Sequence, residues 1–138
     1  MATNMFELTD EFKLGIESVD SEHQQLIDML NHTYQLLNNG QREQARIYFK
    51  KALTDYIDEH FANEEAMLIN IKYPKLSEHA QVHKQFKLSF QRLAPKIEAG
   101  DDAAFRQALA DTYTWLISHI GKTDKRYARY YFEQQGKM

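Results

Sequence analysis

The chain has 138 residues, a formal net charge of −3 and no cysteine. This length suits one domain that buries its own core, and the absence of cysteine excludes disulfides, thiolate zinc sites, iron–sulfur clusters and thiol catalysis. The balance of 17 basic and 20 acidic residues gives no indication of a nucleic-acid or anionic-membrane partner. Five glycines and two prolines are too few for a turn-rich β fold. The composition favours helices, and its one unusual feature is the presence of six histidines.

The first residues, MATNMFELTD, contain neither a basic region nor the apolar run of a secretory signal. No segment approaches the roughly 20 apolar residues of a membrane span, so the sequence predicts a cytoplasmic protein without a transmembrane helix. Residues 1–19 are predicted to form an arm. Its apolar side chains would pack along the outside or across one end of the domain: Phe6, Leu8, Phe12, Leu14 and Ile16.

Four long helices follow the arm, each bounded by residues typical of helix ends. Asp20 or Ser21 would cap the first helix, and Gly40 and Gly100 would follow the ends of the first and third. The predicted ranges are Asp20 to Asn38, Glu43 to Ile69, Pro74 to Ala99, and from the Asp101 and Asp102 cap to Ile120. Their connections are short, so neighbouring helices should be antiparallel. We therefore predict one all-α domain over 1–138, an up-down-up-down four-helix bundle at 20–120 with a short C-terminal helix within 121–138.

Most histidines fall on the apolar faces of these helices. The third helix shows this in the stripe Leu76, His79, His83, Phe86, Phe90, Leu93 and Ile97. The second helix shows the stripe Phe49, Leu53, Tyr56, His60, Glu64, Met67 and Ile71, and the fourth shows Phe105, Ala108, Thr112, Leu116 and His119. The stripe of the first helix includes His23, and the tail adds Asp124 and Tyr127. A buried polar group costs free energy unless it is satisfied. Five inward histidines and two inward acids therefore indicate a polar centre inside the bundle. His32, nine residues after His23, lies about half a turn away and is predicted to be a surface residue.

The spacing of these residues favours a metal site. His60 with Glu64, and His79 with His83, are i,i+4 pairs whose side chains project from successive turns of one helix face. A buried carboxylate must either have a raised pKa, so that it is protonated, or be neutralised by a nearby cation. Two cations bridged by Glu64 and Asp124, with five imidazoles as further ligands, would satisfy every group. A histidine-rich set without thiolates points to iron more than to zinc, copper, nickel or manganese.

Other readings of the same residues find less support. HAQVH at 79–83 resembles a zinc-protease helix, but Ala80 stands where that chemistry needs its glutamate. No histidine has a glutamate three positions before it, which excludes the Glu-x-x-His pattern of ferritin-like di-iron proteins. No serine lies in a nucleophile elbow. The aromatic residues of the tail, Tyr127, Tyr130, Tyr131 and Phe132, are predicted to pack rather than to act as redox groups.

Four motifs taken together resemble the hemerythrin family, in its single-domain bacterial form. They are DSEHQQL at 20–26, HFANEE at 60–65, HAQVH at 79–83 and WLISHIGKTDKRY at 115–127. The resemblance extends from about Gly15 to Tyr131. It implies that His79, His83 and His119 bind one iron, that His23 and His60 bind the other, and that Glu64 and Asp124 bridge both irons together with an oxo or hydroxo group.

The resemblance also implies a function. In that family the iron with two histidines keeps an open position for dioxygen, so we expect reversible oxygen binding for storage or for delivery to oxygen-requiring enzymes, and no enzymatic activity. An apolar wall would exclude water, made by Phe61, Trp115, Leu116 and Ile120. We expect a monomer with no nucleic-acid partner. Two alternatives stay open: a di-iron oxidoreductase that consumes peroxide or nitric oxide, and a sensor that signals through a partner.

Overall fold

The computed structural model describes residues 14–136, apart from the side chains of 120–123 and 135–136. The described chain is helical almost throughout and contains no strand. Its elements are α1 (Glu17–Asn38), α2 (Arg42–Asn70), α3 (Leu76–Glu98), α4 (Asp102–Trp115), the π-helix η1 (Leu116–Thr123) and α5 (Asp124–Gly136). None of these helices is both long and apolar enough to cross a membrane.

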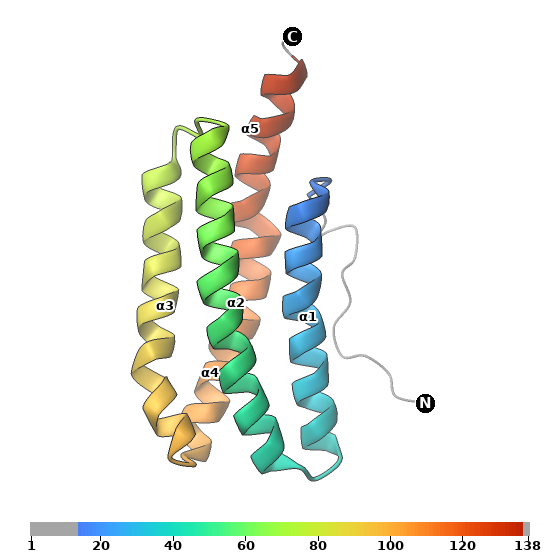
Figure 1. The fold of residues 1–138 in the computed structure, drawn as a ribbon, viewed down its shortest axis with the longest axis vertical. Helices are drawn as coiled ribbons and strands as arrows, with labels where there is room; N and C mark the ends of the chain where they lie inside the picture. Colours follow the sequence, from blue (N-terminus) through green and yellow to red (C-terminus); the bar gives the residue numbers. More distant parts are fainter. Residues whose placement is uncertain (1–13, 137–138) are drawn as a thin grey trace.

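Successive helices run antiparallel and pack side by side (Figure 1). The last three elements form one continuous rod, in which η1 and α5 prolong α4 past the ends of its neighbours (Figure 1). Short connections enforce this arrangement, because a loop of three to five residues returns the chain only to an adjacent antiparallel position. The prediction of an all-α, up-down-up-down bundle with a C-terminal helix is confirmed.

Two of the interhelical turns use glycine as predicted. Gly40 and Gly100 have φ angles of +75° and +92°, the left-handed region that a side chain disfavours. After α1, the Gln41 N–H bonds to the Leu36 carbonyl and the Gly40 N–H to the Leu37 carbonyl, which is the Schellman pattern of helix termination. The turn after α2 places Lys72 at φ +57°, so an ordinary residue takes the same role there.

The start of α1 differs from the prediction. The helix begins at Glu17, with Ile16 at its N-cap, and neither Asp20 nor Ser21 caps it. The Asp20 carboxylate instead accepts hydrogen bonds from the backbone N–H groups of Leu14 and Gly15, which lie ahead of the helix. The carboxylate thus ties down the chain entering the helix from within its first turn. The predicted packing of Phe6, Leu8 and Phe12 lies outside the described residues.

The cap of α4 is confirmed. The Asp101 side chain accepts a hydrogen bond from the Ala104 N–H at 3.2 Å, which satisfies one of the unpaired donors at the helix start.

The apolar core consists of two clusters at opposite ends of the bundle. The larger cluster lies toward the α1–α2 and α3–α4 turns and includes Leu30, Phe49 and Phe105. The smaller lies toward the α2–α3 turn and includes Leu68 and Tyr127. In each helix the buried histidines and acids lie between the residues of the two clusters. The core is therefore interrupted by one polar layer.

The predicted stripe of α2 needs one correction. Met67 and Ile71 are only partly buried, whereas Leu68 is fully buried. A stripe in alternating steps of three and four residues has a period of 3.5, and over a helix of 29 residues it drifts away from the true period of 3.6. The stripe of the fourth predicted helix, which α4 and η1 together form, is shorter, and all its predicted positions are buried: Phe105, Ala108, Thr112, Leu116 and His119.

We predict that Gly40→Ala lowers the free energy of unfolding by about 1 kcal/mol, because an L-residue pays that cost in the left-handed region. A Cβ atom here would meet no other atom within 4 Å, so the loss comes from the backbone alone. Urea denaturation measures the change. Gly40→Asn is the matched variant and should lose less, since asparagine tolerates this conformation. Equal losses in both variants would contradict the explanation.

Candidate metal centre

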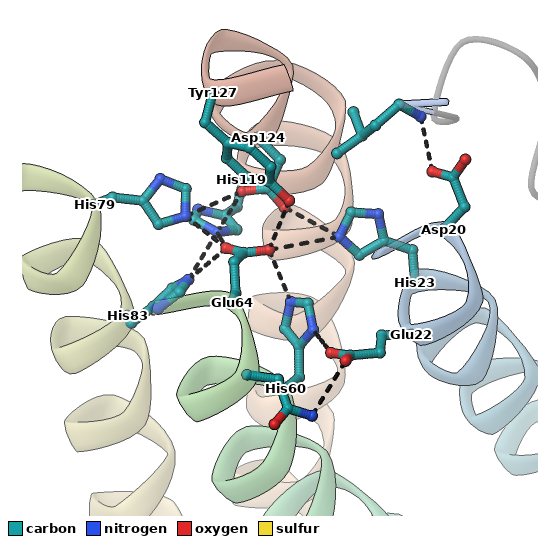
Figure 2. Close-up of polar contacts among 12 residues, drawn as sticks. Asp20, Glu22, His23, His60, Glu64, His79, His83, His119, Asp124 and Tyr127 are labelled. Atoms are coloured by element: carbon teal, nitrogen blue, oxygen red, sulfur yellow. Dashed lines mark hydrogen bonds and ion pairs between the residues drawn. The ribbon is translucent and has the colours of Figure 1, made fainter. Parts of the chain in front are cut away.

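All seven predicted ligands meet in the polar layer, and each is at most 3% exposed. They come from five of the six helical elements (Figure 2). Their positions are His23 on α1, His60 and Glu64 on α2, His79 and His83 on α3, His119 on η1 and Asp124 on α5. His32, the histidine predicted to lie on the surface, is exposed and contacts the Tyr48 ring instead.

Glu64 lies at the middle of the layer and its two oxygens face different histidines. Oε1 lies 2.6 Å from Nε2 of His79 and 3.0 Å from Nε2 of His83. Oε2 lies 3.3 Å from Nε2 of His60 and 4.0 Å from Nε2 of His23. One carboxylate thus spans two groups of imidazoles.

Asp124 divides its oxygens in the same way. Oδ1 lies 2.9 Å from Nε2 of His119 and 3.2 Å from Nε2 of His79, whereas Oδ2 lies 3.0 Å from Nε2 of His23. The donor atoms consequently form two overlapping groups, each within a span of 4.8 Å. One group holds Glu64, His79, His83 and His119, and the other holds His23, His60, Glu64 and Asp124. This is the division into three and two histidines that the resemblance implies.

The π-helix η1 explains how His119 and Asp124 reach the same centre. Residues five apart on an α-helix point about 140° away from each other, because each residue turns the chain by about 100°. The i→i+5 turns of a π-helix are wider and bring such residues back toward one face. The sequence places both residues on the inward face but gives no direct sign of the π-helix, whose eight residues include no proline.

Two glutamates that the sequence analysis did not single out hold the outer nitrogens of two histidines. Glu22 Oε2 is hydrogen-bonded to Nδ1 of His60, and Glu65 Oε2 lies 2.9 Å from Nδ1 of His83. Such partners fix the orientation and tautomer of a ligand imidazole and leave Nε2 free for the metal. The sequence could have indicated both glutamates, because each is adjacent to a predicted ligand: Glu22 to His23, and Glu65 to Glu64.

Tyr127 does more than the predicted packing of the tail. Its ring is fully buried in the smaller apolar cluster, as predicted, but its hydroxyl also donates a hydrogen bond to Glu64 Oε2 at 3.1 Å. The hydroxyl therefore fixes the orientation of the central carboxylate from the α5 side (Figure 2).

Aromatic rings cover the centre on the side of the larger cluster. Phe61 stacks on His83 with the ring centroids 4.1 Å apart, and Trp115 stacks on His119 at 3.8 Å. Leu116 is buried beside them. These three residues support the predicted apolar wall, while the side chain of Ile120 lies outside the described residues. A cleft of about 560 Å³ between α2 and α3 reaches Phe61, Glu65 and His83 from the surface.

The charges of the layer stabilise one another. Burial would raise the pKa of Glu64, but close contacts with four of the histidines hold that pKa well below its ordinary value. Burial and the Glu64 charge would raise the pKa of Asp124, yet contacts with His119 and His23 lower it. The sequence left two alternatives for the acids, a raised pKa or neutralisation by cations, and these lowered pKa values speak against the first.

The histidines respond in the opposite direction. Burial opposes protonation of His60, but its hydrogen bond with Glu22 and its close contact with the Glu64 carboxylate outweigh burial and raise its pKa to about 9. The pKa of His79 also rises to about 9 against the effect of burial, through Asp124 and Glu64. Among the protein groups alone, the carboxylates attract protons to the imidazoles.

The donor set fits a pair of metal ions better than a network of hydrogen bonds. Several buried ligand atoms lack a hydrogen bond of ordinary geometry within the described part of the chain, namely Nε2 of His23 and of His60 and both oxygens of Asp124. Buried polar atoms are rarely left unpaired. Imidazole nitrogens and bridging carboxylates are ligands that iron accepts, so two such ions would satisfy these atoms.

Comparison with known proteins agrees with this geometry. The model of the hemerythrin HHE cation-binding domain matches residues 14–131. A bacteriohemerythrin of Clostridium acetobutylicum is 32% identical over 133 residues, which cover 89% of this chain and 98% of the relative. A bacteriohemerythrin of Stenotrophomonas maltophilia is 31% identical, covering 86% and 76%. A myohemerythrin of Riftia pachyptila is 29% identical, covering 86% and 87%.

We predict that Glu64→Ala or Asp124→Ala abolishes loading of paired iron, because each carboxylate spans both histidine groups. His32→Ala should leave loading intact, since His32 lies on the surface. Elemental analysis of the purified variants measures the iron content. Equal iron in all three variants would refute the assignment of the ligands.

Metal binding should also release protons. At pH 7.5, imidazoles with a pKa of about 9 are mostly protonated, whereas a metal ligand must be neutral. Apparent affinity should therefore rise as the pH increases from about 6.5 toward 9, and proton release should fade above 9. Calorimetric titration with zinc, in two buffers of different ionisation enthalpy, counts the protons released. Identical heats in both buffers at pH 7.5 would show that the imidazoles are already neutral.

Proposed function

Because the chain belongs to the hemerythrin family, we propose that it is a non-haem di-iron protein that binds dioxygen reversibly, for storage or for delivery to oxygen-requiring enzymes. The observation that carries the proposal is the unequal division of histidines around two shared carboxylates. A centre of this kind offers different numbers of ligands to its two metals, and the metal with fewer keeps a position for an external ligand.

The two irons would be held as follows. His79, His83 and His119 would bind one iron, with an oxygen from each of Glu64 and Asp124. His23 and His60 would bind the other, with the remaining oxygens of the same carboxylates. The protein thus supplies five donors on one side and four on the other. An external ligand is therefore expected beside His23 and His60.

The irons, when bound, supply the electrons and the coordination that dioxygen requires. The surrounding side chains keep the centre intact and dry. Glu22 and Glu65 hold His60 and His83 through Nδ1, so that Nε2 faces the metals. Phe61 and Trp115 cover the histidines with apolar rings and exclude water from the layer.

A carrier fits these surroundings better than an enzyme. General acid or base catalysis needs a titratable group positioned toward the substrate, and the carboxylates around the centre are already used by histidines: Glu22, Glu64, Glu65 and Asp124. No specific observation favours the two alternatives, an oxidoreductase that consumes peroxide or nitric oxide and a sensor that signals through a partner. The monomeric state, the cytoplasmic location and any oxygen-consuming partner enzyme stay predictions.

We predict that the reduced, iron-loaded protein gains a visible absorption under oxygen and loses it when oxygen is removed. Repeated spectra under oxygen and then under vacuum test this reversibility. Absence of an oxygen-dependent band would refute oxygen binding. A band that cannot be reversed, together with steady consumption of a reductant, would favour the oxidoreductase instead. His32→Ala, which leaves the centre untouched, serves as the matched control.

A further inference from the structure

Two buried hydrogen-bond donors beside the polar layer lack a well-formed hydrogen bond within the described residues. The Tyr56 hydroxyl and the Trp115 indole nitrogen are buried, and within the described part of the chain neither makes a hydrogen bond of ordinary geometry. Both residues are more than nine-tenths buried, with 8% of Tyr56 and 5% of Trp115 exposed. A buried donor without an acceptor is costly, so each of these two groups needs an acceptor.

Their rings place these donors against the metal centre. Tyr56 stacks on His60, with the ring centroids 4.8 Å apart and the planes 16° apart. Trp115 stacks on His119, which lies four residues further along the same rod. Tyr56 therefore covers the group with two histidines, and Trp115 covers the group with three. Both donors lie on the side of the larger apolar cluster, where few other polar atoms could compete for them.

The chemistry of the two groups gives them distinct roles. A phenol hydroxyl is protonated at neutral pH, because its ordinary pKa is about 10. It can therefore both accept and donate a hydrogen bond. An indole N–H can only donate a hydrogen bond. The Trp115 indole therefore cannot accept the hydrogen of the Tyr56 hydroxyl. The hydroxyl hydrogen is left available for another group.

We propose that the Tyr56 hydroxyl donates a hydrogen bond to the external ligand at the open position beside His60, and that this bond favours ligands which carry negative charge. Trp115 is the positioning residue, because its indole N–H is a hydrogen-bond partner of the Tyr56 hydroxyl and leaves the hydroxyl hydrogen free to point elsewhere. This inference rests on the proposed di-iron centre but not on reversible oxygen binding. A neutral ligand without an acceptor gains nothing from the donor, whereas an anion gains a charge-assisted bond.

The test uses azide, a small anion, with the oxidised, iron-loaded protein. Tyr56→Phe removes only the hydroxyl and keeps the ring on His60. We expect azide to bind about tenfold more weakly to this variant, the range for one lost hydrogen bond to a charged group, with unchanged iron content. The infrared stretch of bound azide should also shift, since it reports directly on a donor that touches the ligand. Tyr48→Phe, which removes a hydroxyl elsewhere on α2, is the matched control.

Wild-type affinity and an unshifted stretch in a Tyr56→Phe variant that loads iron would overturn the proposal. If the variant fails to fold or to load, the wild-type protein decides the question. Its bound azide should show a different stretching frequency in D₂O and in H₂O, because an exchangeable hydrogen contacts the ligand. An identical frequency would equally overturn the proposal. Azide binding without reversible oxygen binding would refute the proposed function and leave this inference standing.

Discussion

The burial of two carboxylates among five imidazoles is the constraint on which the rest of the molecule depends. An isolated buried charge costs far more than the net stability of a domain, so Glu64 and Asp124 require either cations or protonated histidines beside them. The imidazoles meet this requirement when they are protonated, as the lowered carboxylate pKa values and the raised histidine pKa values indicate, and bound metal ions would meet it instead. The two apolar clusters on either side keep water away from this layer and strengthen every electrostatic interaction within it.

The bundle serves the centre through its geometry. Antiparallel neighbours bring side chains from α1, α2 and α3 to one level, although they are far apart in sequence. The rod formed by α4, η1 and α5 needs an additional feature, because α-helical turns alone would point His119 and Asp124 in different directions. The π-helix supplies that device at a cost in regular hydrogen bonding, which is typical of functional sites. Glu22, Glu65 and Tyr127 then fix the orientation of groups that the helices have brought together.

Most of the fold and of the candidate centre could be predicted because both rest on periodicity. Inward histidines such as His79 and His83 stand out when every neighbour in the stripe is apolar. The features that sequence reasoning missed depend on individual contacts instead. Asp20 holds the chain before the helix rather than capping it, and the Tyr127 hydroxyl reaches a carboxylate 63 residues away. Glu22 and Glu65 look like ordinary surface charges until their histidine partners are placed beside them.

The origin of the seven predicted ligands in five different elements has a consequence for the dynamics of the protein. Helices in a bundle commonly open one at a time, and slow amide exchange then divides the chain into units of unequal stability. Here no helix of the bundle can detach without withdrawing a donor from the centre. Bound metal would therefore couple all the elements into one cooperative unit and suppress partial openings, since metal that binds only the native state stabilises it by mass action. Escape of the metal and separation of the helices become a single kinetic event.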